Sequence, residues 1–330
     1  MDRPDVIGVL LMAYGTPDTL ENVEAYYTHI RGGRTPSPQL VEDLRQRYVL
    51  VGGTTPLLQI TEATREALER RLNADGALPF RVILGMKHWH PYIEQAVEQM
   101  AQLGIKRAVG LVLAPHYSRM SIAGYYQYAD AAQAKLDTHI DLIRVESWHL
   151  HPPYLQAVAN RARARLAEFP ADENVTVVFT AHSLPEKILE CDDPYPEQLR
   201  ETSEALASRL GLHLWSPDEM GRTWTFSYQS AGRTAEPWLG PDLVDKVHEL
   251  ADAGVRNILV ASIGFVSDHL EILYDIDYEG QKAAKERGVM LKRTEMLNAS
   301  PDFVEGLAQL VRARVAELST PEASRVNHSS

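Results

Sequence analysis

The chain has 330 residues, of which 45% are hydrophobic and 24% charged, a composition typical of a soluble globular protein with two domains. Its net charge of −12 argues against nucleic acid as a partner, because phosphate binding requires a basic surface. No apolar run approaches the roughly 20 residues that a membrane-spanning helix needs, and the first residues lack a signal-peptide pattern. We therefore expect a cytoplasmic protein without an integral membrane segment.

Apolar runs rich in β-branched residues alternate along the chain with helical patterns. This alternation is typical of an α/β fold with parallel sheets. Strands are predicted at residues 6–12, 81–85, 108–114, 141–145, 175–180, 224–228, 257–263 and 289–293. Helices are predicted at residues 60–72, 92–103, 154–168, 196–210, 243–253 and 301–318.

A weak internal repeat indicates two similar α/β units. Residues 102–107 and the strand after them resemble residues 252–257 and the following strand, 150 residues later. The first unit is predicted to comprise residues 1–115 together with about 300–318, and the second residues 116–299. Residues 319–330 are predicted to form a disordered tail.

Polar residues follow several of the predicted strands. Tyr14 and His182 come after the first strand of each unit, and Glu271 follows the strand at 257–263. Because open parallel sheets bind ligands at the carboxyl edge of their strands, a cleft between the units would bring these residues together. A histidine after a strand serves about as often as a structural hydrogen-bonding residue as it does as a functional one. The place of His182 in a functional site is therefore a hypothesis.

Four acidic residues, Asp268, Glu271, Asp275 and Glu279, follow one another at spacings of three and four residues. In a helix this spacing places them in one row. No lysine or arginine is interspersed, although a solvent-exposed helix face normally carries such residues. Each like-charge pair costs roughly a few tenths of a kcal/mol, so the row predicts a site that receives a cation, although Asp268 is also favoured by the helix dipole.

Cys191 is the only cysteine, which excludes an internal disulfide and any multi-cysteine zinc or iron–sulfur site. A metal ion must therefore be held by nitrogen and oxygen. Such ligands suit ferrous iron in transit better than a permanently buried soft-metal centre. We expect neither an iron–sulfur cluster nor another resident cofactor.

Arginines are concentrated in two short segments, residues 31–34 and 45–48. They are typical either of a solvated amphipathic helix or of guanidinium groups that bind carboxylates through paired hydrogen bonds. The loop at 52–57 carries two hydroxyls but matches no nucleotide-binding fingerprint. A serine hydrolase is excluded, because the adjacent His182 and Ser183 cannot easily form a nucleophile–base pair and no nucleophile-elbow motif is present.

Six short motifs occur along the chain in the order typical of one enzyme family. They are residues 12–17, 52–57, 113–118, 181–185, 229–230 with 237–241, and 264–271. By these motifs the chain resembles the ferrochelatases over nearly its whole length. The resemblance implies two Rossmann-like, chelatase-type units with a porphyrin cleft between them, His182 and Glu271 as the metal-insertion pair, and Tyr14 on the opposite side of the macrocycle.

Within this family the chain most resembles the monomeric, water-soluble branch that acts on coproporphyrin III. The resemblance implies insertion of Fe²⁺, a substrate, into coproporphyrin III to give coproheme in haem biosynthesis, and a transient contact with the next haem-pathway enzyme. Thr55 and Tyr228 depart from the family pattern, which tends to have serine and tryptophan there, and the segment 212–223 is longer than usual, without a predicted function. The residues implied to bind the porphyrin are Tyr14, Arg31, Arg47, Tyr48, Thr55 and Tyr125.

In the expected mechanism, the cleft bends the macrocycle and exposes its nitrogen lone pairs. A neutral His182 then ligates the iron or accepts a pyrrole proton, and Glu271 completes the pair. Asp268, Asp275 and Glu279 are predicted to form an outer path for hydrated metal or protons. Two alternatives remain open: a chelatase for protoporphyrin IX or another tetrapyrrole that takes iron or cobalt, and a haem-binding carrier without insertase activity.

Overall fold

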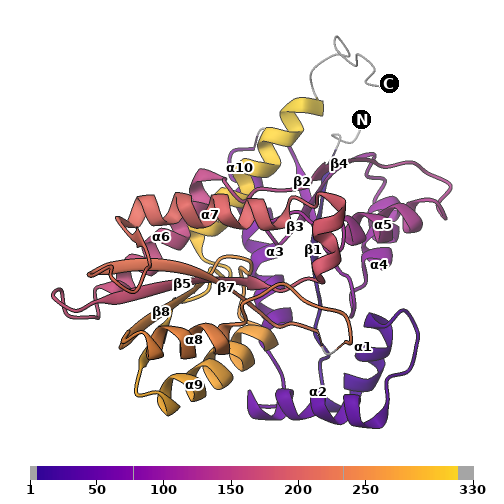
Figure 1. Cartoon of the computed structure of the whole chain (residues 1–330). Coiled ribbons are helices and arrows are strands. Elements are labelled where there is room, and N and C mark those ends of the chain that lie inside the picture. Colours follow the sequence, from indigo (N-terminus) through magenta and orange to yellow (C-terminus); the bar gives the residue numbers. More distant parts are fainter. Residues whose placement is uncertain (1–5, 77, 233, 319–330) are drawn as a thin grey trace.

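The computed structural model describes residues 6–76, 78–232 and 234–318. Two parallel sheets form its centre (Figure 1). In spatial order the first sheet contains β2 (Phe80–Met86), β1 (Ile7–Ala13), β3 (Arg107–Val112) and β4 (Asp141–Val145). The second contains β6 (His213–Leu214), β7 (Arg222–Gln229), β5 (Val175–His182), β8 (Asn257–Ser262) and β9 (Met290–Arg293). The predicted α/β fold with parallel sheets is confirmed.

Helices connect the strands and cover the sheets. Figure 1 shows α1 and α2 below the end of β1, apart from the helices that flank the first sheet. A π-helix, Ile272–Gly280, precedes α9, and no helix within the described ranges is long and apolar enough to cross a membrane. The α-helices are α1 (Val23–Ile30), α2 (Pro38–Leu50), α3 (Leu57–Asn73), α4 (Ile93–Gln102), α5 (Ile122–Gln133), α6 (Pro152–Leu166), α7 (Tyr195–Leu210), α8 (Leu243–Asp252), α9 (Gln281–Glu286) and α10 (Pro301–Leu318).

The internal repeat is present in the structure. Helix α4 and strand β3 recur as α8 and β8, with the same lengths, 150 residues later. β1 lies between β2 and β3, and β5 lies in the same way between β7 and β8. Both central strands are covered on both faces, which explains their continuous apolar sequences: every residue of β1 is buried.

The predicted boundary between residues 115 and 116 does not match the sheets. β4 falls within the predicted second unit, but it pairs with β3 of the first sheet, with Arg107 opposite Asp141. Sequence periodicity identifies a strand but not its neighbour, so this pairing was not predicted. Helix α10 packs against α3 and α6, and Arg71 of α3 forms an ion pair with Glu305 of α10. The predicted tail, residues 319–330, lies outside the described residues.

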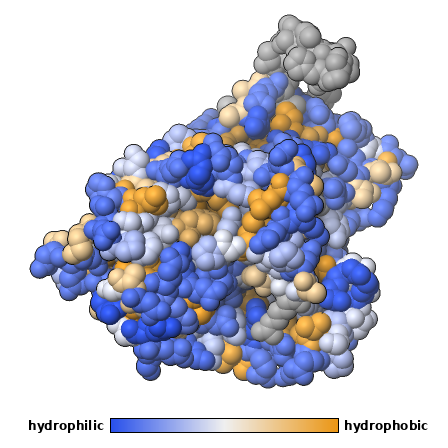
Figure 2. Space-filling model, in the orientation of Figure 1, coloured by the Kyte–Doolittle hydropathy of each residue, from blue (hydrophilic) through white to orange (hydrophobic). Residues whose placement is uncertain are grey.

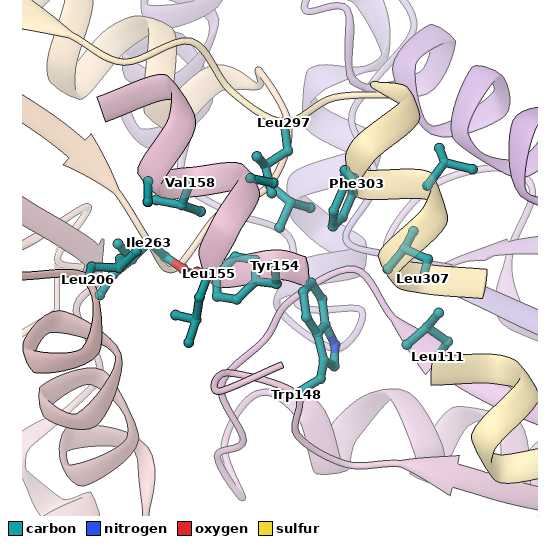
Figure 3. Close-up of a cluster of buried hydrophobic side chains, with 14 of the residues drawn as sticks. Leu111, Trp148, Tyr154, Leu155, Val158, Leu206, Ile263, Leu297, Phe303 and Leu307 are labelled. Carbon is teal, nitrogen blue, oxygen red and sulfur yellow. Dashed lines mark hydrogen bonds between the residues drawn. The ribbon is translucent and has the colours of Figure 1, made fainter. Parts of the chain in front are cut away.

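One hydrophobic core extends across both sheets, and α6 contributes to its centre. Tyr154 of α6 packs beside Trp148 and close to Phe303 of α10 (Figure 3). The Trp148 ring centre lies 5.2 Å from that of Tyr154 and 6.0 Å from that of Phe303. The Tyr154 hydroxyl donates a 2.6 Å hydrogen bond to the carbonyl of Ile263, directly after β8. The core is thereby bonded to the carboxyl end of the second sheet.

Replacing Tyr154 by phenylalanine should lower the free energy of unfolding by about 1–3 kcal/mol, because the buried Ile263 carbonyl loses its donor while the ring remains. Urea denaturation should show a lower midpoint at an unchanged slope. Tyr278→Phe is the control, since Tyr278 is 40% exposed and should tolerate the change. Equal losses in the two variants would contradict a role for the buried bond.

Candidate functional site

A cavity of about 540 Å³ is lined by residues of both units. It lies where the carboxyl ends of β1, β2, β5 and β8 meet, the place where open parallel sheets bind ligands. Tyr14 and Lys87 follow strands of the first sheet, and Tyr125 lies on α5, which packs against that sheet. His182 and Glu271 come from the side of the second sheet. Figure 2 shows one face of the molecule, which is largely hydrophilic with apolar residues in small groups. The cavity combines apolar, aromatic and charged side chains, a lining that is typical of a binding site.

Two glycines allow the loops at this edge to approach each other. Gly15 has a φ of +99°, in the region that favours glycine, and follows Tyr14 directly. Gly264 lies so close to β5 that a Cβ atom there would be 2.6 Å from Cβ of Ala181. The chain after β8 therefore passes directly over the end of β5, which brings Glu271 near His182.

His182 and Glu271 form an ion pair, with Nε2 3.5 Å from Oε1. Burial alone would lower the pKa of His182, but the Glu271 carboxylate and the Ser183 carbonyl raise it to about 9. Burial also opposes the charge on Glu271, yet His182 and His269 hold the pKa of that carboxyl well below its usual range. Both groups are therefore charged at neutral pH. The neutral His182 expected as a metal ligand therefore requires that the metal displaces the proton from Nε2.

Three residues that the sequence did not single out hold this pair. His269 Nε2 lies 3.7 Å from the second carboxylate oxygen of Glu271. Gln229 donates a 3.1 Å hydrogen bond to the Glu271 carbonyl, and the Tyr195 hydroxyl donates one of 2.9 Å to the His182 carbonyl. His269 and Gln229 lie within motifs that carry the family resemblance, but Tyr195 has no comparable sequence signal.

The acidic row is partly present. Asp275 is buried in the π-helix, a helix type that is frequent at functional sites. Burial and the charges of Glu271 and Glu279 raise the pKa of Asp275 to about 7. A hydrogen bond from the Ser230 hydroxyl and the charge of Arg47 act in the opposite direction. Glu271, Asp275 and Glu279 therefore interact, and Asp275 exchanges its proton near neutral pH.

Asp268 does not belong to this row. It precedes the helix, and its Oδ1 lies 3.2 Å from Arg293 Nη2 while its Oδ2 accepts a hydrogen bond from Asn298. Arg293 also pairs with Asp277 at 2.8 Å. The basic partner missing from the sequence segment is supplied by β9, so the predicted single row of four acids is wrong.

Two of the predicted porphyrin-binding residues, Tyr14 and Tyr125, line the cavity. Tyr48 and Thr55 do not. Both are buried, and each hydroxyl lies 3.1 Å from Oγ1 of Thr16, where it supports the loop that carries Tyr14. The hydroxyls of Tyr48 and Thr55 therefore hold the loop at Thr16, and neither residue lines the cavity.

Arg31 and Arg47, also predicted to bind the porphyrin, do not line the cavity. Arg31 directly follows α1, after the lining residue Ile30, and Arg47 lies on α2. The Arg47 guanidinium lies 4.8 Å from the centre of the Tyr274 ring, and that of Arg31 lies 5.9 Å from the centre of the Tyr27 ring. Within the described part of the chain, Nε of Arg31 has no hydrogen-bond partner. Held against aromatic rings, both guanidinium groups remain suited to binding carboxylates.

Replacing Ser230 by alanine should raise the pKa of Asp275 above about 7, because the carboxylate form loses the hydrogen bond that stabilises it. The measurement is a ¹³C NMR titration of labelled aspartate carboxyl groups. Ser227→Ala is the matched control, since the Ser227 hydroxyl donates to the carbonyl oxygens of Tyr228 and Pro241 and not to Asp275. An unchanged or lower midpoint in Ser230→Ala would refute the assignment.

Comparisons with known proteins identify the family of the chain. Residues 6–315 match the family model described as Ferrochelatase. The chain is 47% identical over 305 residues to a ferrochelatase of Herpetosiphon aurantiacus, covering 92% of this chain and 97% of the relative. It is 44% identical over 314 residues to a coproporphyrin III ferrochelatase of Geobacillus kaustophilus, covering 94% and 96%. SirB from Bacillus subtilis with Fe³⁺ shares the fold, with a TM-score of 0.55 at 13% identity, covering 94% and 96%. The chain therefore belongs to the ferrochelatase family of metal chelatases.

Proposed function

We propose that this ferrochelatase inserts Fe²⁺ into coproporphyrin III to form coproheme. The observation that carries the proposal is the His182–Glu271 ion pair in a cavity lined by both units. Coproporphyrin carries four propionates, which suits the nearby Arg31 and Arg47. Several relatives at 42–44% identity are named coproporphyrin III ferrochelatases, which supports the same substrate. The cytoplasmic location, the monomeric state and the contact with the next haem-pathway enzyme remain predictions.

In the proposed reaction, Fe²⁺ replaces the proton on His182. Glu271 is a carboxylate when the iron arrives, because the protonated His182 holds the pKa of that carboxyl below its usual range against the effect of burial. Its charge attracts the cation, and the released imidazole nitrogen becomes a metal ligand. Iron is consumed as a substrate, so the proposal requires no resident cofactor.

Metal insertion also releases the two pyrrole protons of the macrocycle. Asp275, with a pKa of about 7, accepts and releases protons at neutral pH, and the interacting Glu279 extends this acidic group. We assign the two residues to an outer path that supplies metal or removes protons. Tyr14, which is 41% exposed at the cavity wall, contacts the ring from the first unit and stays neutral, because partial desolvation and the charge of Glu271 raise the pKa of its hydroxyl.

Replacing His182 by alanine should abolish metal insertion while leaving porphyrin binding, because the metal loses its nitrogen ligand and the rest of the cavity is retained. Insertion is followed by absorbance, and porphyrin binding by fluorescence quenching. His213→Ala, at an exposed histidine of β6, is the control and should retain full turnover. Normal turnover in the His182→Ala variant would overturn the assignment.

The substrate is tested by mixing the protein anaerobically with Fe²⁺ and either coproporphyrin III or protoporphyrin IX and following the Soret band. We expect a higher kcat/KM for coproporphyrin III. A preference for protoporphyrin IX would overturn the proposed substrate but not the metal-insertion pair. Tight haem binding without insertion into either ring would identify a carrier and refute both.

A further inference from the structure

Lys87 is a cation on the cavity wall that neither the fold nor the metal-insertion pair requires. It follows β2 directly. Its Nζ atom lies 4.8 Å from the centre of the Tyr125 ring and 3.5 Å from the carbonyl oxygen of Ser121. Among the described residues, no carboxylate oxygen lies within 4 Å of this ammonium group. The half-buried charge therefore has only an aromatic face and a carbonyl for compensation.

The place of this ammonium group is set by a glycine. A Cβ atom at Gly124 of α5 would lie 2.6 Å from Nζ of Lys87, so any larger residue would displace the group. Burial lowers the pKa of Lys87 to about 8, and the group still carries its charge at neutral pH. A partly desolvated charge without a counter-ion is costly, and such charges are normally paired. A site that keeps one in place is suited to an anion brought by a ligand.

We propose that Lys87 binds one propionate carboxylate of the tetrapyrrole and selects a ring with four propionates over a ring with two. This inference rests on the proposed function and deepens it. A carboxylate at Nζ would form a charge-assisted hydrogen bond, which is roughly twice as strong as a neutral one. Arg119 also lines the cavity, but it is exposed and already donates a 2.6 Å hydrogen bond to the Cys191 carbonyl. Lys87 is the better placed of the two for a new anion.

The selectivity follows from which elements carry the cations. Arg31 follows α1 and Arg47 lies on α2, whereas Lys87 follows β2 and packs against α5. Protoporphyrin has two adjacent propionates. If both bind Arg31 and Arg47, no propionate remains for Lys87. An apolar vinyl group would then face the ammonium group and desolvate it without compensation. Coproporphyrin supplies a carboxylate at that side instead, so the same lysine attracts one ring and disfavours the other.

The test is equilibrium binding without iron, followed by fluorescence quenching, for coproporphyrin III and protoporphyrin IX. Lys87→Met should weaken coproporphyrin binding by about ten-fold or more, the effect of losing a hydrogen bond to a charged group. Protoporphyrin binding should be unchanged or tighter. Lys106→Met is the matched control, because it removes the same charge from an exposed lysine far from the cavity lining and should leave both affinities unchanged.

Gly124→Ala provides a second variant that keeps the lysine but displaces its ammonium group, and it should weaken coproporphyrin binding selectively. Equal losses for the two rings, or no loss for coproporphyrin, would overturn the role of Lys87, with circular dichroism used to verify that each variant is folded. The outcome is separable from the proposed function. Wild-type insertion of iron into coproporphyrin III can stand while the Lys87 variants fail to discriminate between the rings.

Discussion

The site depends on one close approach of two backbone segments. The chain leaving β8 passes over the end of β5 at a distance that only glycine allows, with Gly264 against Ala181. This contact joins a histidine at the end of one strand to a carboxylate that lies 89 residues further along the chain. The hydrogen bond from Tyr154 to the Ile263 carbonyl holds the same segment from the side of the core. The positions of His182 and Glu271 are therefore fixed by buried packing, which is the kind of support that a precise site requires.

The electrostatics of the cleft follow from this geometry. Glu271 is shared between His182 and His269, so its negative charge persists in a place where burial would otherwise neutralise it. The same charge raises the pKa of the neighbouring Asp275. The Glu271 carboxylate thus keeps His182 protonated as a cation, and it brings Asp275 close to its titration midpoint at neutral pH. Proton movement and metal binding in this site are consequently coupled through Glu271.

Much of the fold could be predicted from the sequence, because strands covered on both faces carry continuous apolar runs. The strand β6 was missed since its two residues are exposed and carry no hydrophobic pattern. The pairing of β4 with β3, and of Asp268 with Arg293, was missed because both are tertiary contacts. For the site, strand ends identified His182 and Glu271, and the motifs implied Tyr125. Lys87 was overlooked, although it follows its strand as directly as Tyr14 does, because one lysine has no pattern to distinguish it.

The recurrence of α4 and β3 as α8 and β8 is the arrangement that duplication of a single ancestral unit would produce. In both copies the cavity is built from the ends of the central strand and its neighbour. The second copy places His182 there, in contact with Glu271, and the first places Tyr14 and Lys87. Two similar scaffolds thus present opposite charges to one cavity, the Glu271 carboxylate from the second copy and the Lys87 ammonium group from the first.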